Sequence, residues 1–238
     1  MRDYDRSLPL IIIHIPKTAG TSTKEFFRRW YGDRLYENYF DQGKGELPPK
    51  RDLAALHTVE KPIAVYGHFN RPRGFGIEDY YPQVSQFITI LRDPFERAIS
   101  TYFFMRRVGT AWNDQSRVPR AELREYLRTT RSNMFNHFPR VVTRDNFRDM
   151  IEEYFIEIGL MEHLSESMER IANKLSMPFD PQWLPHLNPS VRNQENPVDL
   201  KDEYIEHHSL EYLVYDYVLA RFKQAQRVGQ ANESGQPL

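Results

Sequence analysis

One short segment near the start of the chain combines a buried strand, a loop of small residues and an amphipathic helix. Residues 10–15 (LIIIHI) are almost continuously apolar, which is typical of a central strand in a parallel sheet. A loop over residues 16–22 (PKTAGTS) follows, and the pattern over residues 23–31 predicts a helix with aromatic residues on one side. This junction directs backbone N–H groups and the positive end of the helix at one place, where an anion is expected.

Strands and helices alternate along the rest of the chain. Further strands are predicted over residues 62–66, 87–91 and 155–160, and helices over residues 95–107, 120–129, 146–154 and 164–175, with polar loops over 41–52, 70–82 and 178–198. Residues 199–227 are predicted to form one long or broken helix. The alternation predicts an α/β fold with a central parallel sheet flanked by helices. The length of 238 residues favours one domain over residues 1–228, followed by a flexible tail over residues 229–238.

Composition and charge exclude several classes of protein. The net charge of −1 argues against a nucleic-acid partner, although the 32 Lys and Arg residues leave room for a basic cleft. The absence of cysteine excludes disulfides, thiolate catalysis and cysteine-ligated zinc, and it suits a cytoplasmic location. No apolar run reaches the length of a membrane span, and no group of His, Asp and Glu has metal-ligand spacing, so neither a span nor a metal is expected.

The loop after the first strand carries the residue types that bind phosphate. Lys17 offers a positive charge, Thr18, Thr21 and Ser22 offer hydroxyl donors, and Gly20 allows close approach of the backbone. The nucleotide triphosphatase pattern G-x-x-x-x-G-K-[ST] is not met, because the lysine precedes the glycine. By spacing alone, an ordinary turn between strand and helix remains the alternative.

A second anion site is predicted about 75 residues later, where residues 88–102 (ITILRDPFERAISTY) form a strand, a turn and a helix. Arg92 at the strand end is suited to a forked contact with phosphate, and Ser100 lies on the second turn of the helix. For Arg97 we expect pairing with a nearby acid or carbonyl group, and for Tyr102 packing.

Both segments resemble motifs of one enzyme family. Residues 14–22 (HIPKTAGTS) resemble the 5′-phosphosulfate loop of the sulfotransferases that include the heparan sulfate 2-O- and 6-O-sulfotransferases and the chondroitin sulfotransferases, and residues 88–102 are similar to their 3′-phosphate motif R-D-P-x-x-R-x-x-S-x-Y. The resemblance implies a P-loop nucleotide-kinase-like sulfotransferase fold and the co-substrate 3′-phosphoadenosine-5′-phosphosulfate (PAPS), without a metal. It assigns the 5′-phosphosulfate contacts to Pro16, Lys17, Thr18, Ala19, Gly20, Thr21 and Ser22.

The same resemblance assigns roles to individual residues. Lys17 would assist departure of the sulfuryl group, and Arg92 and Ser100 would bind the 3′-phosphate. The Gly-His segment at residues 67–68 resembles that of the 2-O-sulfotransferase group, which makes His68 the expected base for the acceptor hydroxyl. Glu25 is the alternative base, and a histidine that merely caps a strand end is the alternative reading of His68.

The sequence also gives expectations for other polar residues. His14 is expected to be a satisfied core histidine, and His207 and His208 surface residues of the last helix. The proline-rich loop over residues 183–194 carries Asn188, Ser190 and Arg192, and the resemblance implies that a loop here covers the cofactor. Arg192 is expected to reach the 3′-phosphate or the acceptor, with a plain surface connector as the alternative reading of the loop. Asn133 resembles an asparagine in the acceptor region of relatives, within a flanking sequence that departs from theirs.

The sequence therefore predicts a compact, soluble, bacterial-type sulfotransferase that moves a sulfuryl group from PAPS to an acceptor hydroxyl and releases 3′,5′-bisphosphoadenosine (PAP). The resemblance favours a saccharide acceptor. A small alcohol, a lipid or a tyrosine is the alternative acceptor, and a small-molecule kinase or a non-catalytic nucleotide-binding module is the alternative function. The sequence does not predict the oligomeric state.

Overall fold

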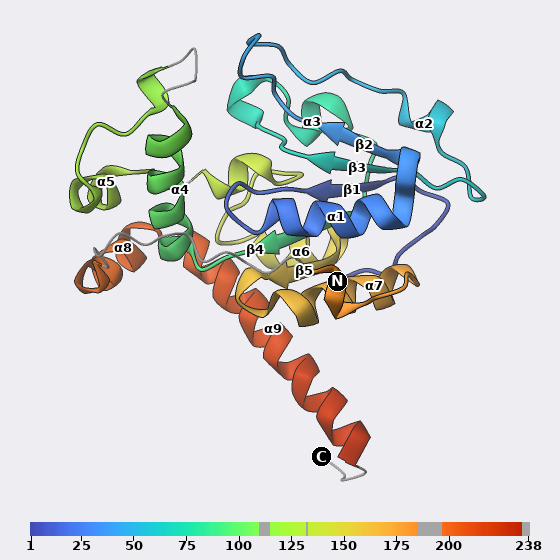
Figure 1. The fold of residues 1–238 in the computed structure, drawn as a ribbon. Coiled ribbons are helices and arrows are strands. Elements are labelled where there is room, and N and C mark those ends of the chain that lie inside the picture. Colours follow the sequence, from blue (N-terminus) through green and yellow to red (C-terminus); the bar gives the residue numbers. More distant parts are fainter. Residues whose placement is uncertain (110–114, 132, 185–196, 235–238) are drawn as a thin grey trace.

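A five-stranded parallel sheet forms the centre of the protein (Figure 1). The computed structural model describes residues 1–109, 115–131, 133–184 and 197–234. The strands are β1 (Leu10–Ile13), β2 (Leu35–Asn38), β3 (Ala64–Gly67), β4 (Phe87–Leu91) and β5 (Phe155–Leu160). They lie in the order β2-β3-β1-β4-β5, and every neighbouring pair is parallel. The predicted α/β fold is confirmed.

Helices cover both faces of this sheet. The longer helices are α1 (Gly20–Tyr31), α4 (Pro94–Val108), α6 (Phe147–Tyr154), α7 (Leu164–Leu175) and α9 (Ser209–Ser234), and the shorter ones are α2 (Leu53–Leu56), α3 (Ile77–Tyr80), α5 (Leu123–Thr129) and α8 (Lys201–His207). Successive residues of a strand point to opposite faces. Leu10 and Ile12 of β1 therefore pack with α1 and α7, whereas Ile11 and Ile13 pack with α3, α6 and α9.

A third apolar cluster lies at the end of the sheet where the strands finish. Helices α4, α5 and α8 stand together there, on the left in Figure 1. Phe95 and Tyr102 of α4 pack with Leu123 and Leu127 of α5 and with Tyr204 of α8. This cluster holds α4 beside the carboxyl ends of the strands, where ligands of open α/β sheets bind.

The element boundaries agree with the sequence in most places and differ in a few. The predicted bounds of β4, β5 and α7 are confirmed, and β1 ends two residues earlier than predicted, at Ile13. Strand β2 was not predicted, because its sequence LYEN has no apolar run; it is an edge strand that pairs only with β3. The last predicted helix takes the broken form that the sequence allowed, as α8 and α9, and α9 continues beyond the predicted end to Ser234. The division into one domain and a tail remains a prediction.

None of the helices in the described ranges combines the length and the apolar character that crossing a bilayer requires.

A buried ion pair joins α4 to α9. One Nη of Arg97 lies 3.2 Å from Oε1 of Glu211, and the two side chains are 5% and 1% exposed. The other Nη of Arg97 donates to Oδ1 of Asn133 at 2.9 Å, and the backbone N–H of Met134 donates to Glu211 at 3.3 Å. The expectation that Arg97 pairs with an acid is confirmed, and Tyr102 is buried as expected. Asn133 therefore has a structural partner in addition to any contact with an acceptor.

We predict that Arg97→Met lowers the free energy of unfolding by about 3–5 kcal/mol, because it leaves the Glu211 carboxylate buried without its cation. Urea unfolding measures this. The double variant Arg97→Met/Glu211→Leu should recover most of the loss, since it removes both charges. The control is Asp199→Asn, which breaks an exposed ion pair with Arg124 and should cost less than about 1 kcal/mol. Equal losses in Arg97→Met and the control would contradict the prediction.

Candidate functional site

The loop between β1 and α1 has the backbone of an anion-binding turn. Lys17 and Ala19 both adopt left-handed conformations, with φ of 70° and 62°. Such conformations are costly for residues with a Cβ and concentrate at functional sites. Ala19 is the N-cap of α1, and no side chain caps the helix there. The first N–H groups of α1 therefore lack a side-chain cap and are suited to an anionic ligand.

Gly20 is required because the His14 ring packs against it. A Cβ built on Gly20 would lie 1.7 Å from Nε2 of His14, far inside van der Waals contact. The Gly20 carbonyl accepts a hydrogen bond of 2.7 Å from the hydroxyl of Tyr66 on β3. The glycine thus serves the packing of the loop on its neighbours, whereas the sequence had suggested close approach to the ligand.

The hydroxyl residues of the loop differ in their surroundings. The Thr18 hydroxyl donates to the Ile15 carbonyl at 2.8 Å, and the residue is 2% exposed. The expected hydroxyl contact from Thr18 to a ligand therefore competes with an internal bond, and the N–H of Thr18 is its better donor. Ser22 is buried and Thr21 is exposed. Pro16 is half-buried at the start of the loop.

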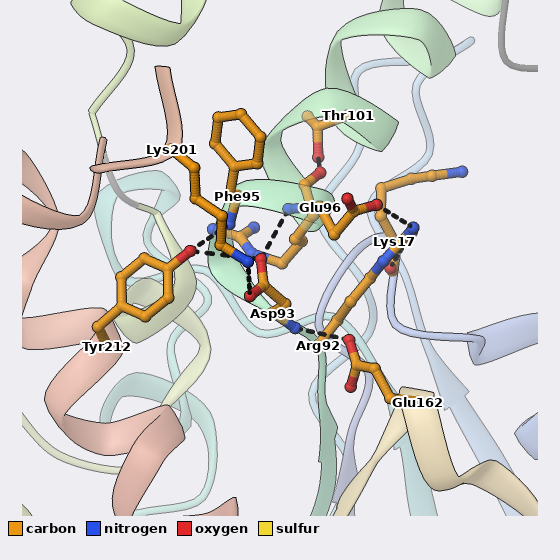
Figure 2. Close-up of polar contacts among 10 residues, drawn as sticks. Lys17, Arg92, Asp93, Phe95, Glu96, Thr101, Glu162, Lys201 and Tyr212 are labelled. Carbon is orange, nitrogen blue, oxygen red and sulfur yellow. Dashed lines mark hydrogen bonds and ion pairs between the residues drawn. The ribbon is translucent and has the colours of Figure 1, made fainter. Parts of the chain in front are cut away.

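Arg92 connects the two predicted phosphate motifs. It follows β4, and one of its Nη atoms donates to the Lys17 carbonyl at 3.4 Å, while the other lies 3.7 Å from the Glu96 carboxylate (Figure 2). Ser100 is half-buried one turn beyond Glu96 on the same helix. Segments 75 residues apart in sequence thus meet at one edge of the sheet, as predicted.

Asp93 holds the start of α4 against the last helices. Its carboxylate accepts from the N–H of Glu96 at 3.0 Å, from the hydroxyl of Tyr212 at 3.3 Å and from the ammonium of Lys201 at 3.0 Å (Figure 2). Its own N–H donates to the Glu162 carboxylate at 2.8 Å. These contacts fix the turn in which Arg92 lies.

Lys17 is half-buried and faces other cations. Burial first, and then the charges of Arg107 and Arg92, hold the pKa of its ammonium below the usual value. Among the described residues it forms no ion pair with an acidic side chain. An anion entering this place would relieve the repulsion.

His68 lies beside the loop because β3 pairs with β1. Its Nδ1 donates to the His14 carbonyl at 2.5 Å. Since a carbonyl only accepts, Nδ1 carries the proton and Nε2 keeps its lone pair. Burial lowers the pKa of His68, against a smaller opposite effect of this hydrogen bond. The imidazole is therefore neutral near pH 7, as a general base must be.

The alternative base, Glu25, lies on α1 and is already engaged. One of its carboxylate oxygens is 3.4 Å from Nε of Arg29, and both side chains are nearly half exposed. This arrangement favours His68.

Among the other histidines singled out in the sequence, His208 corrects an expectation. His208 is 6% exposed, not at the surface, and its ring nitrogens are each 3.1 Å from a carbonyl oxygen, those of Tyr204 and Thr130. His207 is exposed as expected. His14 is packed and hydrogen-bonded to the Tyr39 hydroxyl at 3.0 Å, but it borders the loop and the His68 ring, with ring centroids 4.4 Å apart.

Sequence reasoning missed His137, and it assigned roles to three loop residues that the structure does not describe. His137 is 3% exposed, its ring centroid lies 5.9 Å from that of His68, and burial lowers its pKa to about 3. Its segment, residues 134–137, carries no pattern that would have placed it beside β3. Arg192, Asn188 and Ser190 lie outside the described residues.

Within the described ranges, no group of three or more His, Cys, Asp or Glu side chains is arranged to hold a metal ion.

We predict that Gly20→Ala disrupts the loop, because the new methyl group collides with the His14 ring. The melting temperature should fall, and binding of a nucleotide with a 5′-phosphate should weaken at least tenfold, as measured by calorimetric titration. Adding His14→Ala should restore part of the melting temperature, since it removes the colliding ring, but binding should stay weakened, because the contact that sets the loop is lost as well. Gly43→Ala is the matched control, because its Cβ would meet only Asp41 at 3.4 Å. A Gly20→Ala protein that binds normally would show that the loop tolerates the methyl group.

Comparisons with known proteins agree with this geometry. A family model described as "Sulfotransferase family" matches residues 3–178, which is more than half of the chain. The comparison with curated proteins finds no match. A sulfotransferase from Alicyclobacillus acidocaldarius is similar in structure over 87% of this chain and 96% of its own, with 13% identity and a TM-score of 0.46.

The mouse sulfotransferase SULT7A1, solved in complex with PAP, is similar over 76% of this chain, with 14% identity and a TM-score of 0.43. The match spans 63% of the length of the mouse enzyme. At these scores neither structural likeness supports a functional conclusion, whereas the family match covers the strands and loops that form the site. The chain belongs to the sulfotransferase family.

Proposed function

We propose that this protein transfers the sulfuryl group of PAPS to a hydroxyl group of an acceptor and releases PAP. The observation that carries the proposal is the contact between Arg92 and the Lys17 carbonyl, because it brings two anion-binding motifs to one edge of the sheet. A nucleotide with anionic groups at both its 5′ and 3′ ends needs two such sites. A nucleoside triphosphate needs only one, together with Mg²⁺ ligands.

The loop and α4 supply the donor contacts of this proposal. The N–H groups at the start of α1 and the ammonium of Lys17 would bind the 5′-phosphosulfate. Arg92 and Ser100 would bind the 3′-phosphate. Arg92 would then turn from the Glu96 carboxylate, 3.7 Å away, to the phosphate. Because the contacts of Asp93 fix the turn, the backbone of Arg92 would stay in place during this change.

In the proposed reaction His68 acts on the acceptor. Its Nε2 takes the hydroxyl proton while the acceptor oxygen forms a bond to sulfur and the bond from sulfur to the bridging phosphate oxygen breaks. Lys17 stabilises the negative charge that grows on that bridging oxygen, which leaves with PAP. The His14 carbonyl holds His68 by its Nδ1 proton, so that Nε2 is the nitrogen available for the reaction.

We propose further that the acceptor is a saccharide, and the family resemblance is the main support for this acceptor class. Aromatic rings near the end of β2 and in the following loop add to it: Arg73 lies 3.7 Å above the Phe40 ring, and Tyr39 borders His68 at 4.9 Å between ring centroids. Sugars bind to combinations of flat aromatic and polar groups. A cytoplasmic location also belongs to the proposal, and the lack of cysteine supports it.

We predict that PAP raises the melting temperature far more than 5′-AMP does, and that Arg92→Ala removes most of this difference by deleting the 3′-phosphate contact. At one hundred times its dissociation constant, a ligand stabilises by about 2.7 kcal/mol. Thermal shift measures both nucleotides on both proteins. Arg124→Ala, an exposed change at another ion pair, is the control. Equal shifts for PAP and AMP would refute the 3′-phosphate site, and a preference for ATP with Mg²⁺ would favour the kinase alternative.

We predict that His68→Ala keeps PAP affinity and loses turnover by about 10²–10⁴-fold, the usual cost of a missing general base. In the unaltered enzyme the rate should rise with pH through a value below 6.5, because burial lowers the pKa of His68 and the neutral form is the active one. A radiolabelled PAPS assay across pH measures both. Glu25→Gln is the matched comparison: full loss there, with activity retained in His68→Ala, would make Glu25 the base.

A further inference from the structure

The ammonium of Lys17 lies on an aromatic ring of α4. Its Nζ is 4.3 Å from the centroid of the Phe104 ring. Phe104 is four residues after Ser100, so the two occupy the same face of the helix, one turn apart. A cation at this distance from a ring face is attracted by the ring quadrupole. Figure 2 shows the Lys17 side chain extending beside α4, away from the Asp93 contacts.

The surroundings of Lys17 explain why such a contact matters. Arg107, on the same helix, and Arg92 repel the ammonium, and no described acidic side chain pairs with it. A lysine side chain also has four rotatable bonds, and fixing it in one position costs rotamer entropy. Both arginines repel the ammonium, whereas the ring of Phe104 attracts it and favours one position of the side chain.

We propose that Phe104 is a positioning residue that holds the Lys17 ammonium at the reacting end of the donor site before the donor binds. The proposal rests on the proposed function, because the position matters for sulfuryl transfer. Phe104 does not touch the reacting atoms; it acts through Lys17. Its ring fixes the lysine without forming an ion pair, so the ammonium keeps its whole charge for the bridging oxygen. An acidic partner at the same place would neutralise that charge and compete with the donor.

The test separates a role in chemistry from a role in binding or packing. Phe104→Leu keeps an apolar side chain and removes the ring. We expect kcat to fall about 2- to 30-fold, the equivalent of a cation–π contact of about 0.5–2 kcal/mol, with the Kd for PAP unchanged within twofold. Phe104→Tyr keeps a ring face and should recover kcat. Phe103→Leu is the matched control, because Phe103 packs on Tyr102 in the α4–α5 cluster; it should lower stability without changing kcat.

A second readout needs no turnover. In protein labelled with ¹³C at the lysine ε carbon, the Lys17 signal, identified by its absence in Lys17→Arg, should be shifted upfield by the ring and should move on Phe104→Leu but not on Phe103→Leu. An unmoved signal, an unchanged kcat in Phe104→Leu, or an equal loss of kcat in Phe103→Leu would overturn the proposal. If the unaltered protein does not transfer sulfate from PAPS while the Lys17 signal still responds to Phe104→Leu, the proposed function fails and the lysine–ring contact stands.

Discussion

The packing of the His14 ring against Gly20 is the contact on which the arrangement of the site depends. It joins the end of β1 to the start of α1, and so it sets where the loop between them closes. The His14 carbonyl accepts a hydrogen bond from Nδ1 of His68, and Nδ1 of His14 is hydrogen-bonded to the Tyr39 hydroxyl. One residue after the strand thus ties together the anion-binding loop, the candidate base and the end of β2. Close-packed interiors do not deform continuously, so a change at this contact should move all three together.

The distribution of charge around the site follows from this geometry. Acidic side chains near the strand ends are used for structure: Asp93 caps α4 and holds Lys201 and Tyr212, and Glu211 neutralises the buried Arg97. Among the described residues Lys17 forms no ion pair with an acidic side chain, and Arg92 lies 3.7 Å from the Glu96 carboxylate. A local excess of positive charge arises within a chain whose net charge is −1. Such an excess in a partly buried place favours an anionic ligand more strongly than overall composition would suggest.

The sequence predicted what depends on local pattern and missed what depends on packing. The buried strand β4, the helix α7 and the junction at residues 16–22 carry strong local signals, and the structure has them where expected. Strand β2, with Glu37 and Asn38 among its four residues, carries none; it forms because β3 offers an unpaired edge. His208 and His137 look like any polar residue in sequence, and only the neighbours that tertiary structure brings make them buried. The sequence predicted that Arg97 pairs with an acid or a carbonyl group. It could not identify Glu211, because that residue lies 114 positions away along the chain.

Burial acts on the two candidate catalytic groups in the same direction and leaves them in different states. It lowers the pKa of His68 and that of Lys17, because both groups are cationic when protonated. The usual pKa of an imidazole is near 6.5, so any decrease enlarges its neutral fraction at pH 7. The usual pKa of a lysine ammonium is about four units higher, so the cation has a wide margin above neutral pH. Burial therefore favours a neutral base at His68, while Lys17 has a margin in which to stay a cation. Deeper burial would lower the pKa of Lys17 further and reduce that margin, so the half-buried position of the loop suits the proposed reaction.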